Sequence, residues 1–230
     1  MGLRTARDAV SRIFYQRCFY LFVVLIGLIT VVPFVPPTDY GRLALNAINL
    51  FLLIATIAAV GRTTMSFLVA ILIAAPALWF QHKGLLLDDE GDLARSWMFS
   101  VVLYFLTTLY LLRYVFQPKV MTQDKLFGAA AAYLMLGVLW AYLYALVGHY
   151  YPNSYMVAGT AGGLGYTEAL YFSITVLTST GFGDITPLSR QARGVCMVEQ
   201  IAGALFVAIL IARLAGVYPP RSIQRDEGSD

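Results

Sequence analysis

Charged residues and the usual metal ligands are scarce in this sequence. Asp, Glu, Lys and Arg make up 13% of its 230 residues, and there are only two cysteines and two histidines. Cys18 and Cys196 fall near opposite ends of the apolar segments described below, so no disulfide within one chain is expected. His82 and His149 lie in predicted loops with no cysteine nearby, which excludes an ordinary zinc site.

Catalytic and nucleic-acid-binding motifs are also missing. The chain has no nucleophile elbow, no phosphate-binding loop and no paired catalytic carboxylates. Its net charge of +3 is small and is explained by membrane orientation. We therefore predict that the protein is not an enzyme and has no organic cofactor, no nucleic-acid partner and no small-molecule ligand.

Apolar residues, by contrast, are abundant. They make up 59% of the chain, a composition typical of membrane proteins. A helix of roughly 17 to 25 apolar residues can cross the hydrocarbon layer, and Pro76 is expected to kink one of them. The sequence predicts an all-α membrane protein with six transmembrane helices, at about residues 18–35, 43–60, 64–80, 97–116, 126–147 and 191–217.

The basic residues indicate how these helices are oriented, because short cytoplasmic loops are rich in Lys and Arg. With six spans, most basic residues fall on one side, and Asp39 with the acidic residues at 88–92 falls on the other, beside Lys83, Arg42 and Arg95. Both termini are then cytoplasmic. The alternative, a cleaved signal peptide, lacks a small-x-small site near residues 31–37. Compact loops and the absence of glycosylation sequons favour a prokaryotic inner membrane. The basic residues on the inner side are Arg4, Arg7, Arg12, Arg17, Arg62, Arg113, Lys119, Lys125, Arg213, Arg221 and Arg225.

A short polar segment between the last two apolar segments has the pattern of a cation filter. A permeating cation must exchange its water for protein oxygens, which backbone carbonyls supply without added charge. Gly181 and Gly183 can adopt backbone angles that turn successive carbonyls to one side, and Asp184 would attract cations at the outer mouth. We predict a selectivity filter formed by Ser179, Thr180, Gly181, Phe182 and Gly183.

The residues before this segment predict a half-helix. Residues 149–165 form a polar, Gly-rich outer loop, and Thr167-Glu168 is a plausible start of a helix. A helix over residues 168–178 is about 16 Å long, roughly half the thickness of the hydrocarbon layer. Such a re-entrant segment is tolerated only where it is buried in protein or lines water, which favours a pore.

Residues 126–217 resemble the pore module of the potassium channel superfamily: outer helix, pore helix, filter and inner helix. Against the TVGYGD pattern of that family, the chain keeps both glycines and Asp184. It has Ser179 for Thr, Thr180 for Val and Phe182 for Tyr. Pro187 also lies where the family commonly has a proline, and Gly203 follows Gly183 by 20 positions, the spacing of the family's gating-hinge glycine.

This resemblance implies further roles. Potassium ions would bind at the filter carbonyls, and because one chain has one filter, a homotetramer in membrane lipid is expected. Tyr171, Phe172 and Thr175 would support the filter, with Tyr171 as a partner for Asp184. Glu199 would pack behind the filter against Thr175, Ser173 or a neighbouring subunit, in a structural hydrogen-bonding role or as a proton sensor. The residues expected to line the inner cavity, with ordinary apolar packing as the alternative, are Ala204, Val207, Ala208 and Ile211.

The predicted organisation has five parts. Residues 1–17 are a basic cytoplasmic segment, 18–116 a four-helix voltage-sensor-like unit, 117–125 an interfacial linker, 126–217 the pore domain and 218–230 a short tail. The fourth apolar segment has no charge before Arg113, so weak or no voltage dependence is expected. Three functions stay open: a potassium-selective channel, a weakly selective monovalent cation channel, and a non-conducting scaffold or transporter subunit. No motif in the sequence indicates a gating stimulus.

Overall fold

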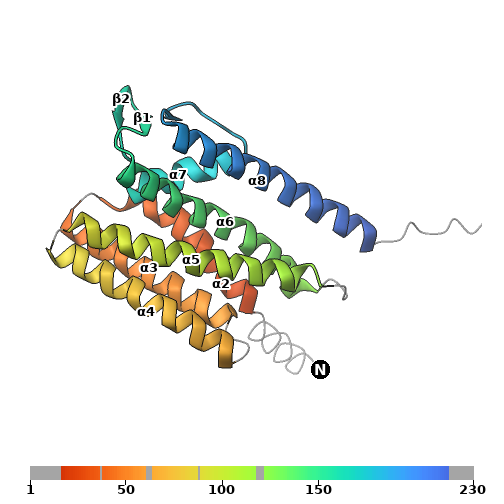
Figure 1. Ribbon diagram of the computed structural model, residues 1–230. Coiled ribbons are helices and arrows are strands. Elements are labelled where there is room, and N and C mark those ends of the chain that lie inside the picture. Colours follow the sequence, from red (N-terminus) through yellow and green to blue (C-terminus); the bar gives the residue numbers. More distant parts are fainter. Residues whose placement is uncertain (1–16, 37, 61–63, 88, 118–121, 218–230) are drawn as a thin grey trace, which may run out of the picture.

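The computed structural model describes residues 17–36, 38–60, 64–87, 89–117 and 122–217. The predictions made above for residues 1–16, 118–121 and 218–230 lie outside these ranges. Figure 1 shows a helical bundle in which α6 lies between α8 and the group α2–α5. The helices are α2 (Arg17–Val31), η1 (Val32–Phe34), α3 (Asp39–Val60), α4 (Thr64–Leu87), α5 (Glu90–Val115), α6 (Gln123–Tyr150), α7 (Tyr166–Leu177) and α8 (Arg190–Val217).

Each predicted apolar segment falls mainly within one long helix. Within the described residues, four helices are long and apolar enough to cross a membrane, in the windows Phe67–Gly84, Glu90–Val115, Gln123–Tyr150 and Arg190–Gly216. The apolar stretches Cys18–Phe34 and Leu43–Ile57 are shorter. The helices therefore support a membrane protein, and the arrangement with six spans stays a prediction.

Helix α5 begins earlier than expected. The sequence predicted a span from Trp97, whereas the helix starts at Glu90. Asp89 caps this end, because its side chain accepts a hydrogen bond of 2.8 Å from the backbone N–H of Gly91. Glu90 and Asp92, which were assigned to an outer loop, thus lie in the first turn of the helix, where negative charge is favourable.

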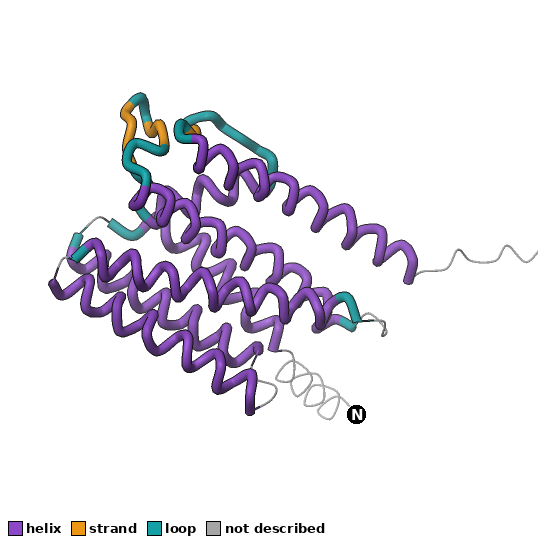
Figure 2. The backbone as a smooth tube through the Cα atoms, viewed as in Figure 1, coloured by secondary structure: helices purple, strands orange, loops and turns teal. Residues whose placement is uncertain are grey.

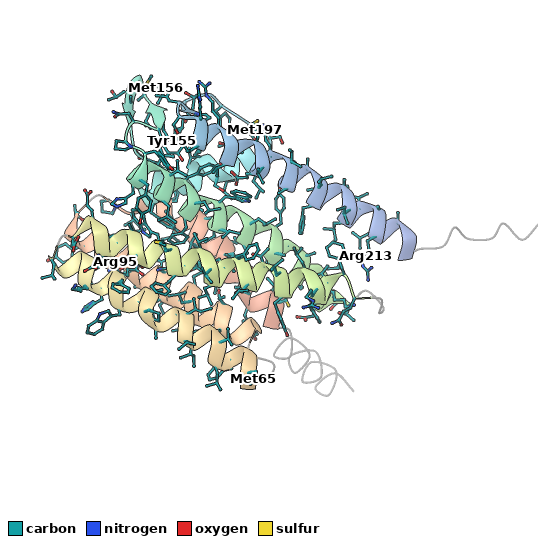
Figure 3. The ribbon with its side chains drawn as sticks, viewed as in Figure 1. Met65, Arg95, Tyr155, Met156, Met197 and Arg213 are labelled. Atoms are coloured by element: carbon teal, nitrogen blue, oxygen red, sulfur yellow. The ribbon has the colours of Figure 1, made fainter. Side chains whose placement is uncertain are left out.

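Asp92 is buried at this end of α5 rather than exposed in a loop. Its Oδ2 lies 2.8 Å from the Nζ of Lys83 on α4, and its Oδ1 accepts a hydrogen bond from Arg95. Arg95 also covers the ring of Phe80. Because a buried carboxylate is costly unless it is paired, these contacts hold α4 and α5 together at one end (Figure 3).

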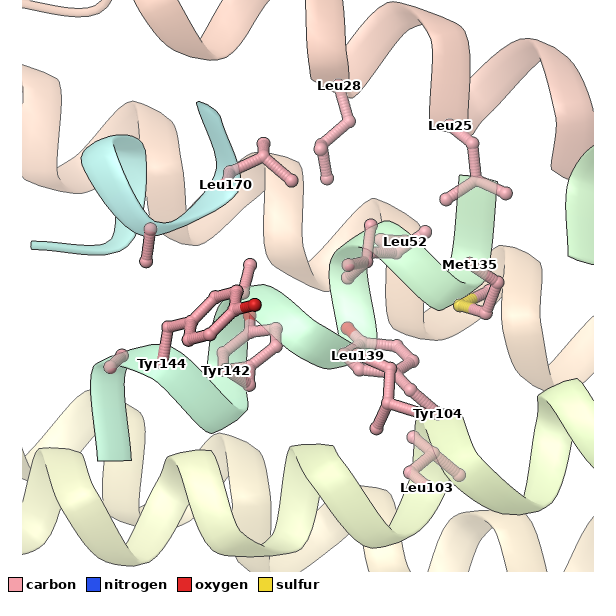
Figure 4. Close-up of a cluster of buried hydrophobic side chains, with 14 of the residues drawn as sticks. Leu25, Leu28, Leu52, Leu103, Tyr104, Met135, Leu139, Tyr142, Tyr144 and Leu170 are labelled. Atoms are coloured by element: carbon pink, nitrogen blue, oxygen red, sulfur yellow. The ribbon is translucent and has the colours of Figure 1, made fainter. Parts of the chain in front are cut away.

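One core joins the four-helix unit to the rest of the chain. Helix α6 packs against α2, α5, α7 and α8. In lipid, helices associate through close van der Waals packing and hydrogen bonds rather than through the hydrophobic effect. Figure 4 shows part of this cluster, and the members labelled there, which belong to α2, α3, α5, α6 and α7, are Leu25, Leu28, Leu52, Leu103, Tyr104, Met135, Leu139, Tyr142, Tyr144 and Leu170.

A polar network crosses the interior of the four-helix unit. The hydroxyls of Tyr104 and Tyr142 each donate to Oδ1 of the buried Asn49 at 3.0 Å. The amide of Asn49 donates to Oε1 of Gln81 at 2.5 Å, and Gln81 donates to Asn46. Buried polar groups require such partners, so the network links α3, α4, α5 and α6.

A small antiparallel sheet lies at one end of the bundle (Figure 2). It consists of β1 (Tyr155–Val157), β2 (Thr160–Gly162) and β3 (Ile185–Pro187), in the order β2-β1-β3. The polar segment predicted as an outer loop, residues 149–165, contains two of these strands, which the sequence analysis did not predict. Strands of three residues are too short to leave an alternating pattern, and β3 pairs with β1 only in the folded chain.

Candidate functional site

Helix α7 has the length of the predicted half-helix. It covers Tyr166–Leu177, about 18 Å at 1.5 Å per residue, and ends where the filter segment, residues 178–184, begins. The sequence predicted the cap at Thr167, two residues later than in the structure. Gly165 is the N-cap residue of this helix, and its backbone N–H donates a hydrogen bond of 3.1 Å to Oε2 of Glu168.

The filter segment has an alternating backbone. Ser179, Gly181 and Gly183 have φ angles of 56°, 55° and 81°, whereas Thr180 and Phe182 are not left-handed. This alternation lets successive carbonyl groups face one side, as a ring of carbonyl ligands requires. Gly181 and Gly183 thus have the predicted conformation, and Ser179 extends the pattern by one step. A left-handed residue with a Cβ costs about 1–2 kcal/mol, strain that is typical of functional sites.

The amides of the filter segment bond back to the end of α7. The N–H of Ser179 donates to the carbonyl of Val176 at 2.9 Å, and those of Thr180 and Gly181 donate to the carbonyl of Thr175 at 2.8 and 3.3 Å. The carbonyls of residues 178–183 accept no hydrogen bond from the part of the chain that the structure describes. They are therefore available as ligands for a cation.

Hydroxyl groups reinforce the inner end of the segment. Oγ1 of Thr178 donates to the carbonyl of Ile174 at 2.7 Å and lies 2.8 Å from Oγ1 of Thr180. Thr175 was predicted to support the filter, and it does contact the segment, but through its backbone carbonyl. Its own hydroxyl donates to the carbonyl of Phe172 at 2.8 Å, because a threonine hydroxyl readily bonds within its own helix.

The aromatic surroundings of the filter differ from the prediction for Phe172. Phe172 is buried behind α7, where its ring lies 4.8 Å from that of Tyr144 and 5.9 Å from that of Tyr155. Phe182 is 70% exposed in the single chain and stacks on Tyr171, with ring centroids 6.4 Å apart. Tyr171, rather than Phe172, is therefore the aromatic partner of Phe182.

The expected contact between Tyr171 and Asp184 is present at the outer mouth. The hydroxyl of Tyr171 donates to Oδ2 of Asp184 at 2.8 Å. The next residue, Ile185, begins β3 and pairs with Val157 of β1. The outer end of the filter segment is thus held by a side chain on one side and by the sheet on the other.

Glu199 lies fully buried behind the filter segment. Its two oxygens contact two different helices, because Oε1 lies 2.6 Å from Oγ of Ser173 on α7 and Oε2 accepts a hydrogen bond from Tyr144 on α6. Ser173 is one of the partners expected for Glu199, whereas Thr175 is not in contact with it. The carboxyl group thereby joins α6, α7 and α8.

The number of protons in the cluster around Glu199 determines which of its groups can donate hydrogen bonds. Oγ of Ser173 also lies 2.8 Å from the carbonyl of Gly137. A serine hydroxyl has one proton and can donate to only one of these two oxygens. If it donates to Gly137, its contact with Glu199 is a hydrogen bond only when the carboxyl group itself carries a proton. A protonated Glu199 therefore satisfies every group in the cluster.

Gly203 lies where α8 passes the end of α7. A Cβ added there would lie 2.3 Å from the carbonyl oxygen of Leu177, the last residue of α7. The same oxygen accepts a hydrogen bond of 3.2 Å from Tyr133 on α6. The structure thus gives Gly203 a packing role, and the gating hinge stays a proposal.

The four residues predicted to line the inner cavity do not pack in the core of their own chain. Ala204, Val207, Ala208 and Ile211 are all exposed, whereas Phe206 between them is buried and its ring lies 5.4 Å from that of Tyr133. The role of these residues in lining the inner cavity, with ordinary apolar packing as the alternative, stays a prediction.

The linker contacts the last turns of α8 at the end opposite to the sheet. The carbonyl of Gln117 accepts hydrogen bonds from Lys125, at 3.3 Å, and from Arg213. The Arg213 guanidinium also lies over the ring of Phe116 (Figure 3). The end of α5 and the end of α8 are thereby joined, and the role of residues 117–125 as an interfacial linker stays a prediction.

Comparison with known families gives the class of this site. Residues 127–218 match a family model described as ion channel. This segment is similar to an ion channel domain. It contains α7, the filter segment, α8 and nearly all of α6, and with the apolar helices it supports an integral membrane ion channel rather than an enzyme. Searches of curated proteins and of solved structures gave no match.

Three contacts of the channel domain were not predicted from the sequence. Tyr133 and Tyr144 on α6 bond to Leu177 and Glu199, and Tyr155 donates to the carbonyl of Tyr144 at 3.1 Å. A signal for the first two was present, because a tyrosine within an apolar helix needs a partner for its hydroxyl. The identity of each partner depended on helix packing.

Proposed function

We propose that the protein is a potassium-selective channel that conducts passively through a ring of backbone carbonyls. The observation that carries this proposal is the backbone of the filter segment, with left-handed residues at Ser179, Gly181 and Gly183 and with free carbonyls between α7 and β3. A bare carbonyl ring can replace the water of a monovalent cation. The C-terminal end of α7 adds partial negative charge at the inner end.

A homotetramer follows from this proposal, because one chain contributes only one strand of the ring. The filter segment is exposed in the single chain, and so are large apolar side chains of α8 such as Met197, Ile201 and Ile211. Neighbouring copies and membrane lipid would cover these surfaces. Ion channel domains are generally multimeric, which is consistent with this assembly. We place the protein in a prokaryotic inner membrane with both termini cytoplasmic.

The four-helix unit does not have the charges of a voltage sensor. On α5, Glu90, Asp92 and Arg95 lie in the first two turns and Arg113 lies in the last turn. The intervening residues are uncharged. Moving one charge through the field supplies about 2.3 kcal/mol per 100 mV, so little work is available for opening. We propose conduction with weak or no dependence on voltage.

A weakly selective monovalent cation channel is the second candidate. Phe182 has no hydroxyl, and its ring is held within the chain by stacking on Tyr171. Ser179 has no methyl group to restrict the inner end of the filter. Both features favour a more compliant ring.

The reversal potential of the purified protein in planar bilayers tests the proposed function. With a potassium gradient across the bilayer opposed by a sodium gradient, we expect reversal near the potassium equilibrium potential and a similar open probability at all voltages. Reversal near zero would favour the weakly selective channel. Absence of current at every voltage and lipid composition would favour the non-conducting subunit.

Replacing Phe182 with tyrosine is expected to make the filter more rigid. The added hydroxyl gives the ring a hydrogen bond as well as its stacking contact, so selectivity for potassium over sodium should rise and inactivation should slow. Bi-ionic reversal potentials and current decay in the two proteins measure these effects. Unchanged values for both would exclude Phe182 as the source of a looser filter.

A further inference from the structure

A cavity of about 490 Å³ lies behind the outer half of the filter segment. Cavities of this size commonly hold small molecules. Residues of α2, η1, β1, α7 and β3 line it together with Asp184, and part of it is open to the surface of the chain, so we place it beside the conduction path. Most of its wall is apolar, including Ile29, Val32, Leu170, Ile174 and Ile185.

Two carboxylates and one phenol interrupt the apolar wall. Glu168, Asp184 and Tyr171 line the cavity. One oxygen of Glu168 accepts from the N–H of Gly165, and one oxygen of Asp184 accepts from Tyr171. Neither carboxylate forms an ion pair with a Lys or Arg in the described ranges. Because a carboxylate can accept about four hydrogen bonds, both have acceptor capacity left for a ligand.

We infer that this cavity binds a single-chain alkylammonium ion. The alkyl chain would fill the apolar part, and the ammonium group would donate to Glu168 and Asp184. A neutral alcohol would leave the carboxylates without a counter-charge. A phospholipid would bring a phosphate toward two carboxylates, which is unfavourable at short range. The proposal does not depend on potassium selectivity, since the site contacts the filter segment only at Asp184 and includes none of the residues 179–183 proposed to bind the permeating ion.

Photoaffinity labelling tests this site. The tetramer in lipid nanodiscs is exposed to three probes that carry the same photoreactive decyl chain: an ammonium, an alcohol and a sulfate. Mass spectrometry then locates the labelled residues. We expect the ammonium probe to label the cavity residues about tenfold more than the alcohol probe, because a hydrogen bond to a charged group contributes at least this factor. The sulfate probe should label least.

Two variants distinguish the cavity from the lipid-facing surface. Ile29→Trp fills the cavity, whereas Ile26→Trp makes the same change at an exposed position of the same helix that does not line it. We expect labelling to fall about tenfold in the first variant only. Glu168→Gln keeps an acceptor for Gly165 but removes the charge, so it should reduce labelling by the ammonium probe and not by the alcohol probe.

Several results would overturn the proposal. These are equal labelling by all three probes, labelling that persists in Ile29→Trp, or labelling confined to α8. If Ile29→Trp does not assemble, Glu168→Gln with the three probes still decides. Labelling needs no ion flow, so a protein that is silent in bilayers can still show the site, and a selective channel can still lack it.

Discussion

Gly203→Ala is expected to prevent stable assembly of the channel domain. The added Cβ would lie 2.3 Å from the carbonyl oxygen of Leu177, and that oxygen belongs to backbone and is also held by Tyr133. Helix α8 must therefore move away from α7. Overpacking of this kind costs about 1–3 kcal/mol, and in a tetramer the cost arises four times. We expect a large fall in thermal stability and no current, measured by thermal unfolding and in bilayers.

Gly194→Ala is the matched control on the same helix. A Cβ at this position would meet nothing within 4 Å in the chain. Replacing an interior helical glycine with alanine then stabilises by about 0.5–1 kcal/mol, so this variant should assemble and conduct normally. A Gly203→Ala protein that assembles with full stability but fails to open would instead support the gating hinge.

Glu199→Ala is expected to lower the stability of the channel domain by about 3 kcal/mol, because it leaves the hydroxyls of Ser173 and Tyr144 without their partner. Glu199→Gln should retain most of the stability. A glutamine can donate through its amide to Ser173 and accept from Tyr144, which reproduces the arrangement of a protonated glutamate. Thermal unfolding of the assembled protein compares the two variants.

Ser173→Ala provides the control for this cluster. It removes the contact with Glu199 and the hydrogen bond to Gly137 together, so its effect should be smaller than that of Glu199→Ala and should add little to it. If Glu199→Gln were as destabilising as Glu199→Ala, the protonated arrangement would be wrong. If Glu199→Gln assembled normally and abolished a pH response of the current, Glu199 would be a proton sensor rather than a structural group.

Local sequence patterns were sufficient to predict the half-helix and the filter glycines of the channel domain. The half-helix before the filter was predicted within two residues, since its length and its polar start are encoded in consecutive residues. The glycines at 181 and 183 were placed correctly because positive φ angles favour glycine. The partner of Asp184 was also predicted, since Tyr171 lies on the adjacent half-helix.

Contacts between distant segments were predicted less well. Phe172 was assigned to the filter and instead packs against Tyr144 and Tyr155, which lie on α6 and β1. Asp92 was assigned to a loop and is buried between Lys83 and Arg95. In both cases the residue type left two environments possible. The choice depended on which helix lay beside it.

Two features could be predicted from the sequence alone: the chain is rich in apolar helices, and one segment has the glycine spacing of a carbonyl filter. These features depend on composition and on backbone preferences of neighbouring residues, which act locally. Other features became visible only in the folded chain. Ser179 continues the left-handed alternation, Gly203 touches Leu177, and Glu199 joins three helices. Such contacts arise when α6, α7 and α8 pack together, because close packing selects partners that sequence distance does not specify.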